Sequence, residues 1–278
     1  MKLVRFGPRG REKPGIIDPS GALRDLSGVV GGIGWEEISP AGLRRLARLD
    51  PGALPKVRGR PRLGVPYAGI SKIVAIGLNY RDHARESNMP IPKEPVVFMK
   101  ATTCINGPFD PLLKPAGSTK MDWEVELGVV IGREARRVDA ARALDHVAGY
   151  CTFNDVSERA FQLEMGGQWD KGKGCDSFGP IGPWLVTRDE VPDPQNLRLW
   201  LAVNGERMQD SSTAEMIFPC AELVSYVSRF MTLNPGDLIV TGTPPGVGMG
   251  RGRFLQAGDV VTLGVDGLGE QRQVVRQA

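Results

Sequence analysis

Polar and apolar residues alternate at the start of the segment 121–131, a pattern that predicts a β-strand. Because successive strand side chains point to opposite faces, Glu124 and Glu126 share a face and lie roughly 7 Å apart, at a rise of about 3.3 Å per residue. The segment continues as an apolar run, so we expect the strand to enter the core. Two carboxylates at the edge of a core repel each other and need a proton, a basic partner or a cation between them.

The spacing of this pair taken alone favours a simpler interpretation, a solvated outer face of an antiparallel sheet. Asp155 adds weight to a cation site, because it follows an apolar strand predicted at 149–154 and therefore lies at a sheet rim. Three carboxylates with several waters suit Mg²⁺, and Mn²⁺ or Ca²⁺ would also fit. The alternative for Asp155 is a cap on the helix that follows it.

The same patterns predict elements along the rest of the chain. We expect strands at 3–6, 15–18, 72–77, 95–100 and 149–154, and helices at 43–49, 80–86, 139–146, 157–165 and 218–231. Asn79 is placed to cap the second helix, and the glycine-rich segment 166–182 is predicted as a loop. Gly-Asp turns at 236–237 and 258–259 each feed an apolar strand, which indicates consecutive strands of one rolled sheet.

These elements indicate an α+β fold that is mainly β, in two parts. Prolines and glycines crowd the segment 50–66, which predicts a linker. We place the boundary near residue 68, with a small N-terminal domain plus linker at 1–68 and a larger domain at 69–278. The 36 glycines and 22 prolines favour many turns and a strand-rich fold over a helical bundle.

Composition excludes several classes of protein. Of the 278 residues 41% are hydrophobic and 24% charged, as in ordinary globular proteins, and the net charge of +3 is spread without basic aromatic patches. We therefore expect no nucleic-acid partner. Nothing approaches the ~18 apolar residues of a membrane span, and no signal peptide is visible, so we expect no membrane association. Four widely spaced cysteines fit reduced thiols in a cytoplasmic protein.

The chain has two histidines, His83 and His146, so a histidine-rich zinc site is excluded and a cation would have to be held by oxygen. His83 and Glu86 are three residues apart on a predicted helix and face the same way. A carboxylate beside an imidazole fixes its tautomer and raises its basicity, which makes a usable general base. An incidental pair on a surface helix explains the spacing equally well.

Two glycine-rich segments could contact an anion. Gly167 and Gly172-Lys173 nearly spell a phosphate loop, but Gly174 replaces the Ser or Thr and no predicted strand leads in, so we reject that interpretation. The segment 241–248 could present a hydroxyl and backbone N–H groups, or it could be a structural turn. No Gly-x-Ser-x-Gly elbow is present, which argues against a serine triad.

Taken together and in order, these pieces resemble the fumarylacetoacetate hydrolase family over about residues 70 to 275. The matching residues are 77–83 with Glu86, 98–100, 122–127, 153–159, Lys173 and 241–244. The first 68 residues look like the small extra domain of a bacterial subgroup. That subgroup includes 2,4-diketo-3-deoxy-sugar-acid hydrolases, acylpyruvases and proteins labelled ureidoglycolate lyase.

The resemblance implies a rolled mixed β-sheet with flanking helices, a small N-terminal α/β domain, a homodimer and a bound Mg²⁺ or similar ion. The residues that match the family's functional positions fall into three groups: metal ligands Glu124, Glu126 and Asp155; catalytic residues His83, Glu86 and Lys173, the first two on a mobile lid; and substrate contacts Arg159, Gln162 and Thr243. Gly174-Cys175-Asp176 follows the lysine where many members have an aromatic residue, which leaves the pocket shape open.

The activity implied by the resemblance is metal-dependent hydrolysis of a C–C bond in a 2,4-diketo acid, either an acylpyruvate or a 2,4-diketo-3-deoxy sugar acid. The products would be pyruvate and a carboxylic acid. The alternatives are decarboxylation of a β-keto acid such as oxaloacetate, isomerisation of a dienoate diacid, and cleavage of ureidoglycolate. A catalytically silent metal-binding dimer is a further alternative, against which the presence of both His83 and Glu86 argues.

Overall fold

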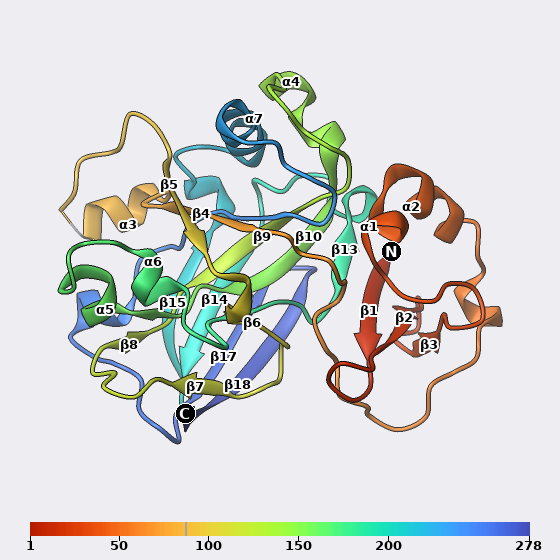
Figure 1. Cartoon of the computed structure of the whole chain (residues 1–278), viewed down its shortest axis with the longest axis horizontal. Coiled ribbons are helices and arrows are strands. Elements are labelled where there is room, and N and C mark those ends of the chain that lie inside the picture. Colours follow the sequence, from red (N-terminus) through yellow and green to blue (C-terminus); the bar gives the residue numbers. More distant parts are fainter. Residues whose placement is uncertain (87) are drawn as a thin grey trace.

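A large mixed β-sheet runs through the middle of the molecule, as shown by the computed structural model, which describes residues 1–86 and 88–278 (Figure 1). Within those residues the sheet has nine strands. In sheet order they are β3 (Leu23–Asp25), β2 (Lys13–Ile17), β1 (Lys2–Phe6), β13 (Leu185–Thr187), β10 (Val147–Asn154), β9 (Val125–Ile131), β16 (Leu238–Val240), β4 (Ile73–Gly77) and β5 (Val96–Lys100). β9 and β10 pair antiparallel near its centre.

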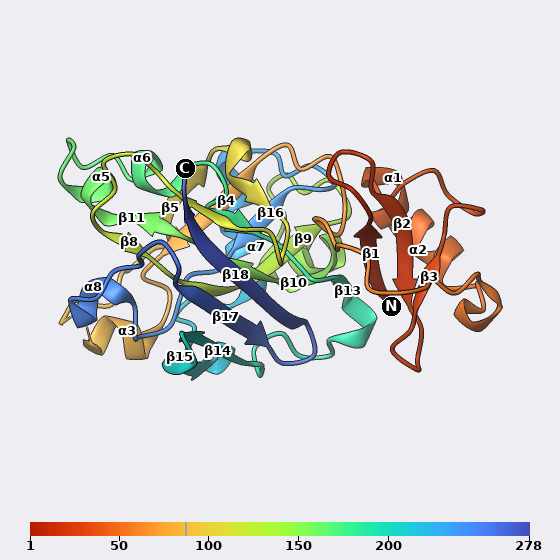
Figure 2. The ribbon, with the colours of Figure 1, turned by 90° about the horizontal axis from the view of Figure 1, so that it is seen from below.

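Every residue of β9 and β10 is buried, because a second sheet packs against them. The strands of this second sheet, in order, are β15 (Glu206–Ser212), β14 (Arg198–Val203), β17 (Val260–Val265), β18 (Gly269–Gln277) and β7 (Leu112–Lys114). β17 contacts both β9 and β10, and Figure 2 shows β17 and β18 running across the central strands. The apolar run in 127–131 is thus explained by burial on both faces.

Short helices and two small strand pairs complete the fold. The pairs are β8 (Met121–Asp122) with β11 (Ser157–Glu158) and β6 (Ile105–Asn106) with β12 (Gly179–Pro180). The helices are α1 (Trp35–Ile38), α2 (Pro40–Leu46), α3 (Arg81–Glu86), α4 (Ala140–Ala143), α5 (Arg159–Leu163), α6 (Asp170–Lys173), α7 (Cys220–Phe230) and α8 (Gly248–Arg251). The mainly β fold with flanking helices agrees with the sequence prediction.

The N-terminal strands continue the large sheet. β1 pairs antiparallel with β2, with Leu3 opposite Ile16, and its other edge pairs with β13 (Figure 1). A tight turn closes β2 onto β3, since the Gly21 N–H donates to the Asp18 carbonyl at 2.8 Å. The boundary near residue 68 stays a prediction.

Three local predictions about the chain were wrong. The two strands that follow the Gly-Asp turns, β16 and β17, belong to different sheets, because the long segment between them carries α8 and crosses from one sheet to the other. The predicted loop 166–182 contains α6, which ends at Lys173. Asn79 does not cap α3, because its buried amide donates to the carbonyls of Phe218 and Thr241 at 3.1 and 2.8 Å.

Two further findings concern membrane-spanning helices and the cysteines. No helix within residues 1–86 and 88–278 is both long enough and apolar enough to cross a membrane. The four cysteines are free, and three of them are buried, as expected for reduced packing thiols.

Candidate active site

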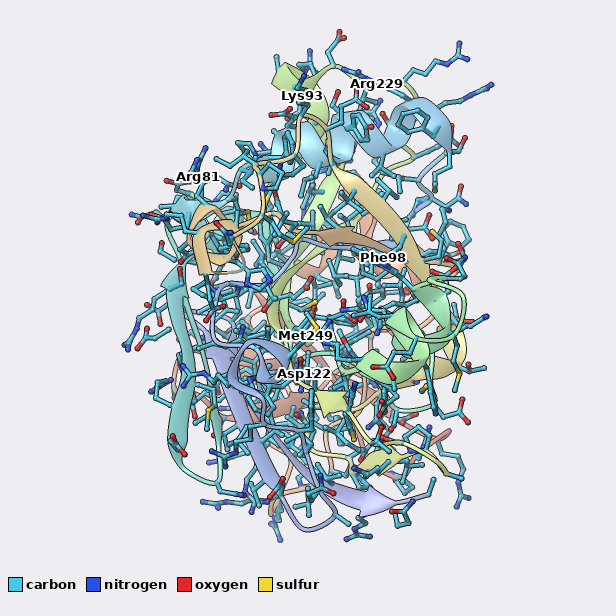
Figure 3. The ribbon with its side chains drawn as sticks, turned by 90° about the vertical axis from the view of Figure 1, so that its left-hand side faces the viewer. Arg81, Lys93, Phe98, Asp122, Arg229 and Met249 are labelled. Carbon is cyan, nitrogen blue, oxygen red and sulfur yellow. The ribbon has the colours of Figure 1, made fainter. Side chains whose placement is uncertain are left out.

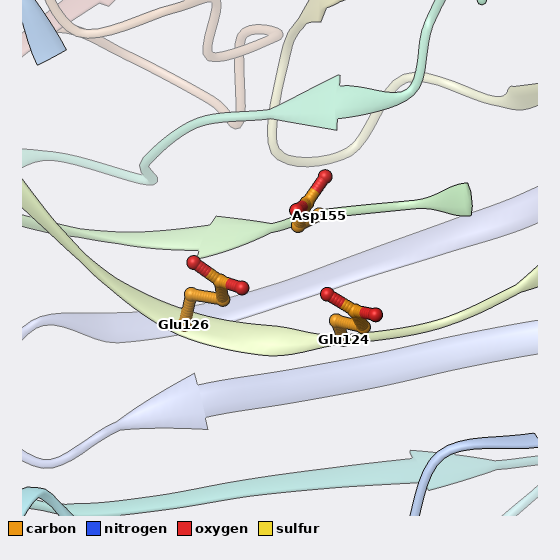
Figure 4. Close-up of side chains that lie close together, drawn as sticks. All are labelled: Glu124, Glu126 and Asp155. Carbon is orange, nitrogen blue, oxygen red and sulfur yellow. The ribbon is translucent and has the colours of Figure 1, made fainter. Parts of the chain in front are cut away.

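Three carboxylates converge where β9 and β10 lie side by side. Glu124 precedes β9, Glu126 lies within it, and Asp155 follows β10. One oxygen from each carboxylate lies within 4.8 Å of the others, and the side chains share one side of the strands (Figure 4). Only 7%, 1% and 0% of their surfaces are exposed, so the solvated outer face considered for the glutamate pair is wrong.

Asp155 does not cap the helix that follows it. The cap of α5 is Glu158, whose carboxylate accepts from the Ala160 N–H at 3.1 Å. The Asp155 carboxylate instead accepts from the ammonium groups of Lys100 and Lys173, at 2.5 and 2.8 Å. Its position at the end of β10, predicted from the sequence, therefore places it against two buried cations.

Lys173 and Arg159 neutralise Glu124. The Lys173 ammonium group donates to Glu124 at 2.8 Å, and the Arg159 guanidinium group donates to it at 2.5 Å. Burial opposes ionisation of Glu124, but these two cations lower its pKa to about 2. Arg159 also donates to Asp122 at 2.8 Å and to the amide oxygen of Gln162 at 3.0 Å. Both predicted substrate contacts of α5 thus lie at the carboxylate cluster.

Glu126 has no cationic hydrogen-bond partner among the described residues. Its hydrogen bond there comes from the backbone N–H of Gly242, at 2.8 Å. Burial and the negative charges of Asp155 and Glu124 raise the pKa of Glu126 well above the usual range. Buried oxygen donors that carry surplus negative charge fit a divalent cation such as Mg²⁺ or Mn²⁺.

The raised pKa of Glu126 predicts that cation binding releases a proton. In the metal-free protein this carboxyl group keeps its proton to a higher pH than an ordinary glutamate, and it must lose that proton to bind a cation. The affinity for Mn²⁺ should therefore fall as the pH drops below the raised pKa. Calorimetric titration at mildly acidic pH should give heats that depend on the ionisation enthalpy of the buffer. Glu126→Gln should remove that dependence, and an equal dependence in both proteins would contradict the assignment.

Lys100 is a part of the cluster that the sequence prediction of the site missed. This residue ends β5, and its side chain is fully buried. Its ammonium group donates to Asp155 at 2.5 Å, to the carbonyl of Val156 at 3.3 Å and to the carbonyl of Lys173. Lys100 thereby ties the end of α6 to the end of β10, the two places that supply Lys173 and Asp155.

Replacing Lys100 with methionine should destabilise the metal-free protein by about 3–5 kcal/mol, because buried Asp155 loses one of its two cationic partners. A bound cation supplies positive charge to the same cluster. Mn²⁺ should therefore raise the free energy of unfolding of this variant by more than it raises that of the wild-type protein. Urea unfolding with a chelator and with Mn²⁺ measures both quantities.

Lys114→Met is the matched control for this prediction. Lys114 is also a buried lysine, but its ammonium group donates to neutral acceptors, the Leu255 carbonyl at 2.9 Å and the Gln256 amide oxygen at 3.2 Å. Its replacement should reduce stability without enlarging the gain on addition of Mn²⁺. The same gain in both lysine variants would show that Lys100 has no role in balancing charge at the cluster.

His83 and Glu86 lie together on α3. The Nδ1 atom of His83 lies 3.4 Å from the Glu86 carboxylate, and the histidine is half-buried. Glu86 also accepts from the backbone N–H of Gly246, at 3.1 and 3.0 Å to its two oxygens. A proton on Nδ1 that is shared with Glu86 leaves Nε2 as the basic nitrogen. The carboxylate therefore orients the imidazole and holds α3 against the segment 241–248.

Backbone N–H groups of the segment 241–249 bind the protein's own carboxylates. Gly242 donates to Glu126, while Gly248 and Met249 donate to Asp122 at 2.6 and 3.0 Å. The sequence indicated that this segment could present N–H groups to an anion. In the structure these three N–H groups help to position the cluster, and Asp122 joins Lys100 as a contributor that the prediction of the site omitted.

Thr243 is engaged with the backbone of the central strand. Its hydroxyl donates to the carbonyl of Val125 at 2.9 Å and accepts from the side-chain amide of Gln209 at 2.9 Å. The side-chain oxygen of Gln209 accepts from the Val125 N–H at 2.9 Å. Thr243 thus lies at the site, but its hydroxyl already holds β9 in register with the segment 241–248.

A cavity of about 460 Å³ opens beside the cluster. Six of the residues predicted from the sequence line it: His83, Glu124, Arg159, Gln162, Lys173 and Thr243. Glu126 and Asp155 belong to the same site through the cluster, and Glu86 through His83. The structure therefore brings all nine predicted residues to one place. Phe98 and Met249, which also line the cavity, lie on the side of the molecule seen in Figure 3.

Comparison with known protein families identifies the family of this chain. The model of the fumarylacetoacetate (FAA) hydrolase C-terminal family matches residues 72–276, most of the chain. The chain belongs to the fumarylacetoacetate hydrolase family. A Burkholderia cenocepacia relative that carries only a general hydrolase name is 60% identical over 281 residues, and the match covers 100% of both chains. Membership of this family indicates that the protein is an enzyme. The name of the Burkholderia relative does not specify a substrate.

Solved structures of other members have the same fold. A fumarylacetoacetate hydrolase from Exiguobacterium antarcticum is 36% identical with a TM-score of 0.90, and the match covers 100% of both chains. A probable 2-hydroxyhepta-2,4-diene-1,7-dioate isomerase from Mycobacterium abscessus is 33% identical with a TM-score of 0.85, covering 100% of this chain and 99% of the other. A maleylpyruvate hydrolase from Sphingobium sp. SYK-6, in complex with manganese(II) and pyruvate, is 28% identical with a TM-score of 0.85 and complete coverage of both chains.

Proposed function

We propose that the protein hydrolyses a C–C bond in a 2,4-diketo acid, an acylpyruvate or a 2,4-diketo-3-deoxy sugar acid, and releases pyruvate and a carboxylic acid. The observation that carries this proposal is the convergence of Glu124, Glu126 and Asp155 beside a cavity that His83 also lines. The related maleylpyruvate hydrolase, whose structure holds manganese(II) and pyruvate, supports both the cation and the product.

Glu124, Glu126 and Asp155 are the side chains that would hold the cation, for which Mg²⁺ is the first expectation and Mn²⁺ or Ca²⁺ the alternatives. When bound, the cation would polarise the oxygens of the keto acid and offset the negative charge that develops during cleavage. Lys100 and Lys173 hold Asp155 in place, since both donate to its carboxylate.

His83 serves as the general base in this proposal. Glu86 orients the imidazole, and Nε2 accepts a proton from a water whose oxygen bonds to the C4 carbonyl carbon. The C3–C4 bond then breaks, and its electron pair moves to C3 to give the enolate of pyruvate, which takes up a proton. Lys173 lines the cavity and stabilises this negative charge. Arg159 and Gln162 lie where they can orient the carboxylate of the substrate.

The direct test is a panel of acylpyruvates and one 2,4-diketo-3-deoxy sugar acid, each incubated with Mg²⁺ and with a chelator. Loss of the enol absorbance of the substrate and release of pyruvate should occur together. We expect the chelator to stop both and added Mg²⁺ to restore them. Absence of pyruvate release from every compound on the panel would overturn the proposal.

The second candidate is isomerisation of a dienoate diacid or decarboxylation of a β-keto acid. It is favoured by the match to the probable isomerase from Mycobacterium abscessus, which at 33% is more identical to this chain than the maleylpyruvate hydrolase at 28%. In that chemistry the His83–Glu86 pair would move a proton on the substrate without activating a water. Oxaloacetate and a 2-hydroxydienoate should then be turned over, while the acylpyruvates should be bound and left intact.

A further inference from the structure

The cavity at the cluster has a polar side and an apolar side. The polar side consists of the charged residues already described. The apolar side is formed by large side chains from several elements, namely Leu78, Met89, Phe98, Leu163, Trp169 and Met249. A substrate whose keto-acid end lies at the cluster must therefore extend its other end along an apolar wall.

The two aromatic side chains of this wall, Phe98 and Trp169, are held in place by packing. The rings of Phe98 and Trp169 lie edge to face with their centres 5.3 Å apart. The Trp169 ring also lies against the backbone of Gly77, where an added Cβ atom would be only 2.7 Å from it. The Lys173 ammonium group lies 5.3 Å from the centre of the Phe98 ring, so the wall begins directly beside the charged cluster. The two rings thus form a fixed surface and not a loose lining.

Three more apolar side chains stand at the solvent-exposed part of the cavity. Met89, Leu163 and Met249 expose 53%, 45% and 47% of their surfaces. Each belongs to a different segment, so the apolar character of this part does not result from one exposed helix face. Clustered exposed apolar side chains around a cavity are typical of a binding site for an apolar group.

The cationic side chains that line the cavity already form ion pairs with carboxylates of the protein. Lys173 pairs with Glu124 and Asp155, and Arg159 pairs with Asp122 and Glu124. The third basic group of the described lining, His83, is paired with Glu86. A second carboxylate at the far end of a substrate would thus lose part of its hydration against apolar side chains without gaining a free cation as a partner, which is unfavourable.

The described lining also has few hydrogen-bonding groups for a hydroxylated substrate tail. The Thr243 hydroxyl is used by Val125 and Gln209, as shown above. Two side-chain donors remain in the described lining, the indole N–H of Trp169 and the amide nitrogen of Gln162, whose amide oxygen accepts from Arg159. Hydroxyl groups lose their water on entering such a site and regain few hydrogen bonds.

We propose that the acyl tail of the substrate is an uncharged alkyl or aryl group, which makes the substrate an apolar acylpyruvate. This inference rests on the proposed function and narrows it, because it selects against tails that carry a carboxylate and against the polyhydroxylated tail of a sugar acid. The keto-acid end lies at the carboxylate cluster, and the tail lies between the Phe98–Trp169 wall and Met249.

Two substrates of nearly equal shape test this proposal. Succinylpyruvate has a terminal carboxylate, and 4-methylpentanoylpyruvate has an isopropyl group in its place, with methyl groups where the carboxylate has its two oxygens. With Mg²⁺ present, kcat/KM for pyruvate release should be at least about 100-fold higher for the methylpentanoyl compound. A 2,4-diketo-3-deoxy sugar acid should also be at least about 100-fold worse than the methylpentanoyl compound. Equal values, or a preference for the charged or hydroxylated tail, would overturn the proposal.

A new cation in the apolar part of the cavity should reverse the preference in part. Leu163→Arg places a guanidinium group there, at a side chain exposed enough to be replaced without loss of the fold. The ratio of kcat/KM between the two isosteric substrates should shrink at least about tenfold. Phe230→Arg, at an apolar side chain exposed by 66% at the end of α7 and not part of the cavity lining, should leave the ratio unchanged. An equal change in both variants would show a general effect of net charge and would count against the proposed tail site.

The outcome also separates this inference from the proposed function. If both isosteric compounds are cleaved at equal kcat/KM, the hydrolase assignment stands and the apolar tail is refuted. If neither of them nor the 2,4-diketo-3-deoxy sugar acid releases pyruvate, the hydrolase assignment fails, and the dissociation constants of the two isosteric compounds, measured by calorimetry with Mg²⁺, still compare the two tails. Tighter binding of the methylpentanoyl compound would then support the tail site, while equal binding or no binding would overturn it.

Discussion

Replacing Asp155 with asparagine should abolish chelator-sensitive release of pyruvate and lower the affinity for Mn²⁺ by at least about 100-fold. The lower limit follows from the known effect of outer partners of metal ligands, whose loss already weakens binding about 10- to 100-fold. The substitution keeps the shape of the side chain and removes the charge that Lys100 and Lys173 both contact. Titration of Mn²⁺ by electron paramagnetic resonance gives the affinity without reference to activity.

The control for this variant is Asp145→Asn. Asp145 is an exposed carboxylate that forms ion pairs with Arg142 and Arg188. Neither arginine is hydrogen-bonded to the clustered carboxylates. It should leave both Mn²⁺ affinity and turnover unchanged. Because loss of a buried ionic partner costs about 3–5 kcal/mol, the Asp155 variant must be assayed below its unfolding temperature. Full Mn²⁺ affinity in the folded variant would remove Asp155 from the set of ligands.

Replacing His83 with alanine should lower kcat by about 10²–10⁴-fold, the usual contribution of a positioned general base. The affinity for Mn²⁺ should stay unchanged, because the hydrogen bond of this side chain is to Glu86 and not to the three clustered carboxylates. Single-turnover measurement of pyruvate release, together with Mn²⁺ titration, separates the two quantities.

His146 offers a matched comparison, as the second histidine of the chain. Its Nδ1 atom lies 2.7 Å from the backbone carbonyl of Glu134, and it does not line the cavity at the cluster. His146→Ala should retain full kcat. Parallel loss of kcat and metal binding in the His83 variant would mean that His83 supports the structure of the site and does not act as the base.

The carboxylate cluster was accessible to sequence reasoning because its geometry is local. Glu124 and Glu126 share a face through the two-residue period of a strand, and Asp155 emerges at the end of an adjacent buried strand. The contact between Asp155 and its neighbours then follows from the pairing of β9 with β10. The fold class followed in the same way from short apolar strands separated by glycine and proline.

Lys100 and Asp122 could not be assigned in the same way, because their partners are set by the tertiary structure. A lysine at the end of a strand is normally exposed, and the sequence contains no signal that the end of α6 and Asp155 both lie within its reach. The prediction that the strands after the two Gly-Asp turns are consecutive in one sheet was wrong for a related reason. Similar local sequences start β16 and β17, but only the packing of the whole chain decides which sheet each joins.

The double contact of Glu86 has a consequence for how affinity and turnover relate. One carboxylate both orients His83 and accepts the N–H of Gly246, so docking of α3 and activation of the base form a single event. A compound that occupies the cavity but props α3 away from the segment 241–248 would separate His83 from its orienting group while its keto-acid end stays bound. Such a compound would act as an inhibitor despite having the correct reactive end, and the tightest ligands of this protein need not be its fastest substrates.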